Sequence, residues 1–248
     1  TQPDAALSLS LTDTDITCFG LTNGSISSSV NGGIANYTYA WKKDGTSINS
    51  TTANINNLGT GTYELTVTDN NGCTITKTAT ITQPTELEVD SITPSNYNGF
   101  GVKCYEDENG TIDLEVSGGT APYTYAWKKD GTTINNVTTQ DLSGLGVGTY
   151  SVTITDANNC TKTTSVEITE PVELTIADAG LSTAIACFGD NGQIKIDITG
   201  DSNGSGSNQD YTYDLYQGNS VVQTKTFSNL NHTFNAPAGT YKVRVTDA

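Results

Sequence analysis

The segment GTYELTVTD (Gly61–Asp69) alternates apolar and polar side chains along its length. Its Tyr, Leu and Val side chains fall on one side, and its Thr and Glu side chains fall on the other. A period of two, rich in β-branched and aromatic residues and bounded by Gly and Asp, is typical of a strand with one buried face. The phrase returns as GTYSVTITD (Gly148–Asp156) and GTYKVRVTD (Gly239–Asp247). The sequence therefore predicts β-strands that recur along the chain.

The same order of three motifs recurs with this strand. A cysteine phrase begins at Cys18, Cys104 and Cys187, an aromatic block follows each phrase, and the Gly-Thr-Tyr strand follows each block. Recurrence of this kind indicates an array of similar modules. The third copy stops before its second cysteine, which explains the odd number of five cysteines. We expect three repeats, at residues 1–84, 85–171 and 172–248, and a chain that is a segment of a longer protein.

Each repeat has the size and strand rhythm of an immunoglobulin-like sandwich. We therefore predict an all-β fold of three tandem immunoglobulin-like β-sandwich modules. Pro84 and Pro171 lie at the joints with almost no spacer, and proline stiffens a junction, so we expect an elongated rod. In the first repeat the predicted strands lie near residues 7–16, 25–31, 36–43, 46–49, 53–58, 62–68 and 74–82.

The aromatic block YTYAWKKD occurs at Tyr37–Asp44 and again at Tyr123–Asp130. Alternate residues of a strand share a face, so its Tyr, Tyr and Trp side chains lie together. The third copy replaces Trp with Leu215 and, on the opposite face, Ala with Asp214. These exchanges favour a buried aromatic face and a solvated opposite face; the alternative is an exposed platform that stacks on sugars. The residues concerned are Tyr37, Tyr39, Trp41, Tyr123, Tyr125, Trp127, Tyr211, Tyr213 and Leu215.

The charge balance excludes several classes of partner. The chain has 248 residues, with 11 Lys and Arg against 27 Asp and Glu, for a net charge of −16. Nucleic acid and anionic membrane surfaces repel such a chain, whereas hard cations such as Ca²⁺ suit it. No apolar run is long enough to insert into a membrane. A single histidine, His232, has no counterpart in the other copies, so we expect no enzyme activity.

The combined motif resembles the SprB repeat, named for a surface adhesin of gliding bacteria. Copy one departs from it at Asn36, where the motif has Pro, and copy three carries an insert at Gly200–Asp210. The motif is most complete in copy two, at Cys104, Asn109, Gly110, Gly118, Gly119, Pro122, Tyr123, Trp127, Gly148, Thr149, Tyr150, Asp156 and Cys160.

The resemblance implies type IX export and display on the outer face of the outer membrane in long tandem arrays. An envelope gliding machinery moves such a filament along the cell. The filament binds an extracellular substratum, for example a polysaccharide. The resemblance thus implies force-bearing stalk repeats that support attachment and gliding motility. The alternative is a glycan- or protein-binding module of another secreted surface protein.

Export implies an oxidising compartment, where regularly spaced cysteines usually pair. Pairing within a repeat would join Cys18 to Cys73 and Cys104 to Cys160. In a standard sandwich, however, these loops lie at opposite poles, and a disulfide needs Cα atoms within about 7 Å. In a head-to-tail array the facing poles permit Cys18–Cys160 instead, with Cys104 and Cys73 left for neighbouring repeats. Inter-repeat bonds, intra-repeat bonds and free thiols all stay open.

The facing poles of neighbouring repeats would also bring acidic residues together at the two joints. Six to eight oxygen ligands hold Ca²⁺, so these carboxylates suggest a calcium site that rigidifies the array. The competing interpretation is that Asp and Asn here form ordinary turns by binding their own backbone. The first joint would contain Asp13, Asp15, Glu86 and Asp156; the second would contain Glu106, Asp107, Glu108, Glu170, Glu173 and Asp247.

Overall fold

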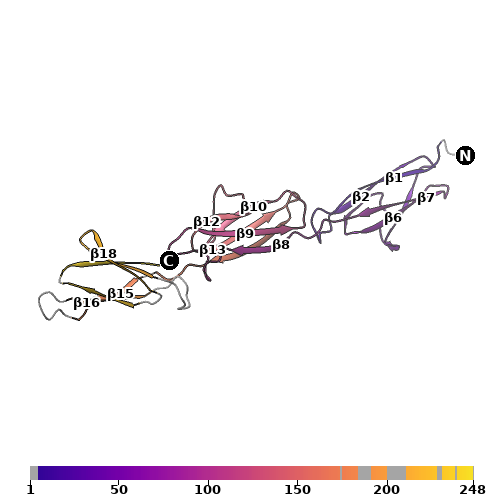
Figure 1. Ribbon diagram of the computed structural model, residues 1–248. Helices are drawn as coiled ribbons and strands as arrows, with labels where there is room; N and C mark the ends of the chain where they lie inside the picture. The colour runs from indigo at the N-terminus through magenta and orange to yellow at the C-terminus, as the bar shows by residue number, and fades with distance from the viewer. Residues whose placement is uncertain are drawn as a thin grey trace. The chain divides into compact units, whose positions relative to one another are not determined.

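A computed structural model describes residues 5–173, 175–183, 191–199, 211–227, 231–237 and 239–247. Throughout these ranges the regular structure consists of β-strands (Figure 1), which confirms the predicted all-β class. The strands form six sheets, and each sheet is built from strands of one predicted repeat. The fold is therefore a series of strand sets, each with two sheets.

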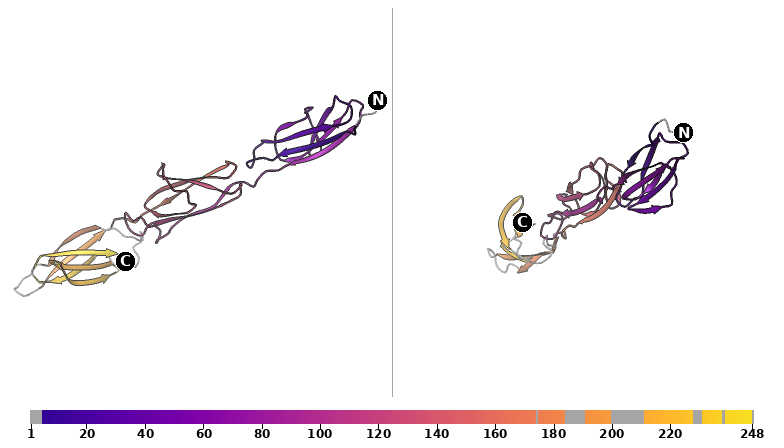
Figure 2. Two further views of the ribbon diagram at one scale, coloured as in Figure 1. Left: turned by 90° about the horizontal axis from the view of Figure 1, so that it is seen from above. Right: turned by 90° about the vertical axis from the view of Figure 1, so that its right-hand side faces the viewer.

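The first set has the seven strands that the alternation predicted. One sheet has three strands in the order β1-β2-β5, and the other has four in the order β4-β3-β6-β7. Neighbouring strands run antiparallel. In Figure 2 its indigo and purple strands lie beside one another in both further views. The strands are β1 (Ser8–Thr14), β2 (Gly24–Asn31), β3 (Thr38–Lys43), β4 (Thr46–Ile48), β5 (Ile55–Leu58), β6 (Gly61–Thr68) and β7 (Thr74–Ile81).

The apolar faces of these two sheets meet in one core. Trp41 is 1% exposed, and its Nε1 donates a hydrogen bond to the Thr52 carbonyl at 2.9 Å. Tyr37 and Tyr39 are half-buried and pack against the rim of the core. The aromatic block thus supplies core and not a sugar platform. The buried members of this core are Leu9, Ile16, Ile26, Trp41, Ile55, Leu58, Tyr63, Leu65, Val67, Ala79 and Ile81.

The turn after the aromatic block is a tight hairpin. Lys43 pairs with Thr46, so only Asp44 and Gly45 connect β3 to β4, and both have positive φ, 47° and 79°. Two positive φ values in a two-residue loop are typical of a type I′ turn, whose twist matches the flanking strands. The Asp44 carboxylate also accepts a hydrogen bond from the Thr62 amide at 2.8 Å. The Asp-Gly pair therefore fixes the register of the four-stranded sheet.

The second set repeats this arrangement with the sheet orders β12-β9-β8 and β11-β10-β13-β14. Trp127 is fully buried, with Nε1 donating to the Thr139 carbonyl at 3.0 Å, while Tyr123 and Tyr125 are half-buried. Its strands are β8 (Glu88–Pro94), β9 (Gly110–Ser117), β10 (Thr124–Lys129), β11 (Thr132–Thr133), β12 (Leu142–Leu145), β13 (Gly148–Thr155) and β14 (Thr161–Ile168).

The third set has the sheet orders β15-β16-β19 and β18-β17-β20. Tyr211, Tyr213 and Leu215 are all buried, so Leu215 takes the core position that Trp holds in the other sets. The insert at 200–210 lies outside the described residues. The strands of this set are β15 (Thr175–Thr183), β16 (Gly192–Thr199), β17 (Tyr211–Gln217), β18 (Ser220–Phe227), β19 (Asn231–Ala236) and β20 (Tyr241–Asp247).

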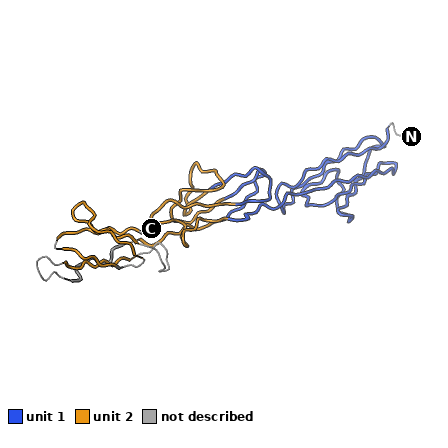
Figure 3. The backbone as a smooth tube through the Cα atoms, in the orientation of Figure 1, with its two compact units in different colours: residues 1–91, 115–126, 153–164 blue, residues 92–114, 127–152, 165–248 orange. Residues whose placement is uncertain are grey.

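The chain divides into two compact units (Figure 3). Unit 1 contains residues 1–91, 115–126 and 153–164, and unit 2 contains residues 92–114, 127–152 and 165–248. The predicted division into three repeats stays a prediction. Its boundaries fall between strands, because β7 ends at Ile81 before β8 begins at Glu88, and β14 ends at Ile168 before β15 begins at Thr175.

Candidate functional site

A disulfide joins Cys18, in the loop after β1, to Cys160, in the loop between β13 and β14. The two Cα atoms are 5.8 Å apart, and 142 positions separate the residues in sequence. Both residues lie in unit 1, although they come from different predicted repeats. Of the pairings that the sequence left open, this is the inter-repeat bond, and Cys18 does not pair with Cys73.

The other cysteines are placed as follows. Cys73 lies in the loop between β6 and β7 and is an exposed thiol. Cys104 is also exposed, and its backbone amide donates to the Asp107 carboxylate at 3.1 Å. Cys187 lies outside the described residues. The disulfide therefore makes the junction around Cys18 and Cys160 the candidate functional site of unit 1.

The loop that carries Cys160 is shaped by one buried carboxylate. Oδ1 of Asp156 accepts the amides of Asn158 and Cys160, both at 2.8 Å, and Oδ2 accepts the amide of Thr120 at 2.9 Å. The carboxylate thus fixes the loop backbone on one side and the Gly118-Gly119 turn on the other. Asn158 then reaches out of the loop, and its Nδ2 donates to the Thr17 carbonyl at 2.9 Å.

The loop that carries Cys18 is tied to the linker between the first two strand sets. Asp15 Oδ1 accepts the Thr82 amide at 2.6 Å, and the Ile16 amide donates back to the Thr82 carbonyl at 3.0 Å. Gln83 Oε1 accepts the Gly20 amide at 3.0 Å. The hydrogen bond from the Thr82 backbone lowers the pKa of Asp15 below its usual 3.8. The linker therefore sets the position of the Cys18 loop.

The other end of the linker is held by the Gly118-Gly119 turn. The Gly119 amide donates to the Thr85 carbonyl at 3.0 Å. Gly118 has a φ of +70°, and a Cβ there would lie 1.7 Å from the Glu86 carbonyl oxygen. Only glycine permits this approach of two backbones. Linker residues 82–86 thus contact both repeats, and these contacts bring the two cysteine loops together.

The predicted calcium site at the first joint stays a prediction. Among the described residues, no group of three or more His, Cys, Asp or Glu side chains is arranged to hold a metal ion. The physical reason is that the carboxylates have other partners. Asp156 and Asp15 bind backbone amides, and Glu86 pairs with Lys162 at 3.2 Å. Asp13 lies in β1 opposite Ile26.

The second joint shows the same use of carboxylates as backbone acceptors. Glu170 Oε2 accepts the Glu106 amide at 2.8 Å, which matches the bond between Gln83 and Gly20 at the first joint. Asp107 accepts Asn109 Nδ2 at 2.7 Å. The negative charges of Glu106, Glu173 and Glu170 raise the pKa of Tyr105 above 10.0. Glu108 belongs to the same loop, and the side chain of Asp247 lies outside the described part.

Asp69 is the counterpart of Asp156 in the first repeat, and we expect it to make the stability of the chain depend on pH. Its carboxylate accepts the amides of Ile34, Asn71 and Cys73 at 2.8–3.0 Å, and the Ile34 bond chiefly lowers its pKa below 3.8. A carboxyl with a lowered folded pKa stabilises the fold above its unfolded pKa, and this contribution is lost as the pH falls through the folded pKa. We expect the melting temperature to fall as the pH drops below about 4.

The Asp69→Asn variant should melt at a lower temperature at pH 7 and should lose less on acidification than the parent chain. Circular dichroism melts between pH 7 and 2 measure both effects. The matched control is Asp13→Asn, since Asp13 is an exposed strand residue. Equal acid sensitivity of the Asp69→Asn variant and the parent chain would contradict this role.

The predicted solvation of Asp214 is wrong. Asp214 is 7% exposed, because β18 and β20 place Thr224 and Arg244 directly beside it. The Thr224 hydroxyl donates to it at 2.6 Å and Arg244 Nη2 donates at 2.7 Å, and these two bonds lower its pKa. The carboxylate points away from the core, as its strand position requires, but its neighbours cover it.

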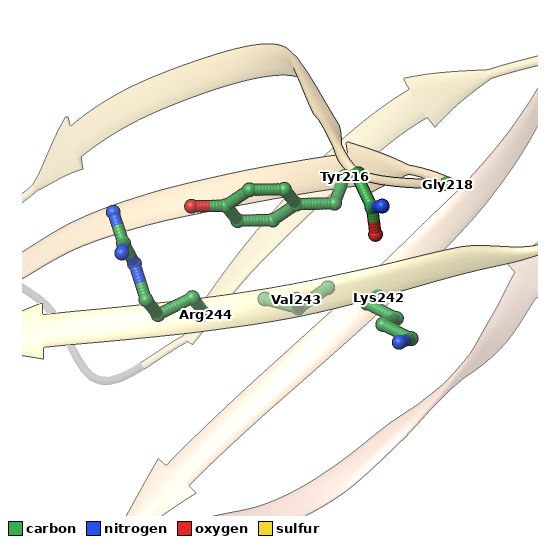
Figure 4. Close-up of a pocket in the computed structure, with 6 residues that line it drawn as sticks. Tyr216, Gly218, Lys242, Val243 and Arg244 are labelled. Carbon is green, nitrogen blue, oxygen red and sulfur yellow. The ribbon is translucent and has the colours of Figure 1, made fainter.

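Arg244, the cation of this ion pair, also lines a shallow hollow of about 290 Å³ (Figure 4). Its lining includes Tyr216, Lys242 and Arg244, and the guanidinium of Arg244 lies 5.5 Å from the centre of the Tyr216 ring. Arg244 is engaged by Asp214, and the lining contains no carboxylate, thiol or imidazole for proton transfer. His232 is stacked on Phe227 at 4.0 Å, where burial lowers its pKa. Neither place provides a catalytic constellation.

Sequence reasoning missed several residues of the junction. Asn158, Gln83 and the Gly118-Gly119 turn position the two cysteine loops, yet each appeared as an ordinary turn or linker residue. A signal was present, because Thr-Gln-Pro at residues 82–84 has a counterpart in Thr-Glu-Pro at residues 169–171. Within the described ranges, no helix is both long enough and apolar enough to cross a membrane.

Comparison with known proteins shows what the chain is similar to. A decoration protein of Escherichia phage T5 is 39% identical over 57 residues, which is 21% of this chain and 35% of that protein. The chain thus spans about a third of the length of this curated relative.

Two solved structures have low sequence identity to the chain. The three N-terminal domains of the bacteriophage RB49 Highly Immunogenic Outer Capsid protein are 15% identical, with a TM-score of 0.46 and 94% of this chain and 88% of that chain covered. Extracellular domains 3–5 of Drosophila OTK are 12% identical, with a TM-score of 0.28 and 86% and 85% covered.

The SprB repeat family matches residues 10–46 and 102–132. Each match extends across one cysteine phrase and one aromatic block, the segments that contain Cys18 with Trp41 and Cys104 with Trp127. The match indicates an adhesin-type repeat of an extracellular or surface protein. The SprB repeat model thus matches two segments of the chain, residues 10–46 and 102–132, and each segment lies in a set of two β-sheets.

Proposed function

We propose that the chain is a non-catalytic, load-bearing segment of a long extracellular adhesin that supports surface attachment and gliding. In this role the parent protein leaves the cell by the type IX route and is displayed on the outer membrane. The parent protein binds an extracellular substratum, for example a polysaccharide, while the envelope gliding machinery moves the parent protein. The repeats hold the adhesive part away from the cell and transmit force.

One observation supports load bearing above the others, namely the covalent bond between Cys18 and Cys160. A polypeptide linker alone leaves neighbouring modules joined by one backbone. Here the linker and the disulfide both join the two predicted repeats, and Asn158 adds a hydrogen bond to Thr17 across the same junction. A second covalent connection keeps the two repeats joined when the chain is pulled, which is useful in a part that bears load.

The test compares attachment under flow for cells that display the parent protein in three forms. These are the unchanged protein, a Cys18→Ser/Cys160→Ser variant, and a protein from which residues 1–248 are deleted. We expect the deletion to lower both the attached fraction and the gliding speed. The double variant should attach normally in still medium and detach at a lower shear stress, because only its junction is weakened.

The control is Thr78→Ser, a conservative exchange at an exposed residue of β7 outside both cysteine loops, which should behave like the parent protein at every shear stress. Unchanged attachment and gliding after the deletion would overturn the proposed function. Binding of the purified chain to a glycan array would instead point to recognition by the repeats themselves.

A further inference from the structure

We infer that the β6–β7 loop, which ends at Cys73, is a docking site for a preceding repeat of the same kind. The first cysteine of that repeat would form a disulfide with Cys73, as Cys18 does with Cys160. This assignment goes beyond load bearing, because it names the partner of an exposed surface. It rests on the geometry of the loop and not on the adhesive role, so either proposal can fail without the other.

The first support is that the Cys73 loop is built like the loop that is already bonded. Asp69 Oδ1 accepts the amides of Asn71 and Cys73 at 2.9 and 2.8 Å, and Asp156 Oδ1 accepts those of Asn158 and Cys160, both at 2.8 Å. In both loops the second carboxylate oxygen accepts an amide that follows a Gly-Gly turn. Asn71 therefore occupies the position from which Asn158 binds Thr17.

The second support is that the chain enters both repeats in the same way. The Gly33 amide donates to the Ala5 carbonyl at 2.9 Å, as the Gly119 amide donates to the Thr85 carbonyl at 3.0 Å. A Cβ on Gly32 would lie 2.1 Å from the Ala6 carbonyl oxygen, so this approach also requires glycine. The backbone that leads into the first repeat is thus held beside the Cys73 loop.

The third support comes from the sequence that precedes this contact. Thr1-Gln2-Pro3 is identical to Thr82-Gln83-Pro84, the linker that holds the Cys18 loop through Thr82 and Gln83. The residue that accepts the amide of the Gly-Gly turn follows the proline by two positions at Ala5 and by one position at Thr85, so the linker ahead of the first repeat is one residue longer. A repeat ahead of Thr1 that met this linker as the first repeat meets its own would bring its cysteine loop to Cys73.

The bond forms by oxidation of two thiols. The thiolate of one cysteine attacks a disulfide oxidant, such as oxidised glutathione, and releases one glutathione as its thiol. The second cysteine thiolate then attacks the mixed disulfide and releases the other glutathione. The two cysteines lose two electrons and two protons in total. The two glutathione thiols that form take up these electrons and protons.

The test uses the full chain with one further repeat, a second copy of residues 1–81 joined ahead of Thr1. The added copy carries Phe19→Tyr as a mass label beside its Cys18, and Cys73→Ser so that only the resident Cys73 is offered. After oxidation by glutathione disulfide, a non-reduced digest is analysed by mass spectrometry. We expect the labelled Cys18 peptide to be joined to the Cys73 peptide, and maleimide labelling of Cys73 to be lost.

The resident Cys18–Cys160 bond in the same digest shows that the repeats have folded. A matched chain with Cys73→Ser in the resident repeat should leave the labelled Cys18 reactive toward maleimide. If the resident bond forms while the labelled Cys18 stays a thiol or joins another cysteine, the docking site is disproved. That result would leave the load-bearing role of Cys18–Cys160 untouched, and the flow assay tests that role separately.

Discussion

Reduction of the Cys18–Cys160 disulfide is expected to add about 500 Å to the length of the fully extended chain under tension. The bond closes a loop over 142 positions, and an extended residue spans about 3.3–3.6 Å. With the bond intact, tension applied between the two ends of the chain passes along β1, across the sulfur atoms and into β14. Residues 19–159 then carry no tension, whatever force is applied.

The measurement is single-molecule pulling of the full chain by its ends, before and after addition of a reductant. The oxidised chain should show unfolding steps only from residues outside the loop, and the reduced chain should show additional steps that sum to the expected gain. Cys18→Ser should behave like the reduced chain in both conditions. Cys73→Ser is the matched control and should retain the dependence on reductant.

Equal extension before and after reduction would contradict this account, because it would mean that the bond does not carry the load. The effect depends only on which residues are joined. It is therefore insensitive to the strength of the sheets, and it separates the covalent contribution from the packing of the two cores.

Replacement of Trp127 by alanine is expected to destabilise the second strand set by about 3–5 kcal/mol. Trp127 is fully buried and donates a hydrogen bond to the Thr139 carbonyl. Alanine leaves a cavity and removes the donor, so the carbonyl also loses a partner. Trp127→Leu should cost less, because Leu215 fills the corresponding position of the third set.

Hydrogen exchange of the amides in β10 and β13, followed as denaturant is added, measures this loss. Lys128→Ala is the matched control, since Lys128 is the next residue of β10 and points into solvent. The same protection in the Trp127→Ala variant and the parent chain would show that the aromatic block is not the core. Loss of protection confined to the second set would show that the sets unfold independently.

The fold could be predicted from the sequence because its signals are local. Period-two alternation identifies each strand, and Asp44-Gly45 identifies a hairpin turn. The exchange of Trp for Leu215 identified the buried face, since only a core position accepts both. The pairing of Cys18 stayed open at the level of the sequence, and the structure selects Cys160 among the alternatives.

The expected solvation of Asp214 was wrong because it depended on contacts between distant residues. Asp214 is covered by Arg244, which lies 30 positions away and comes beside it only through the register of β17 and β20. The carboxylates of the predicted calcium site come from separate parts of the chain, and that site stays a prediction. Backbone amides of the neighbouring loops donate hydrogen bonds to several of these carboxylates. The positions of backbone amides cannot be predicted from the pattern of side chains.

The closed loop between Cys18 and Cys160 also bears on survival outside the cell, where proteases reach exposed turns. A single cut anywhere in the backbone between these two residues yields two fragments that the disulfide still holds together. The exposed turn at Asp44-Gly45 is one such place. The chain would stay continuous after such a nick, because the disulfide still joins the part before the cut to the part after it.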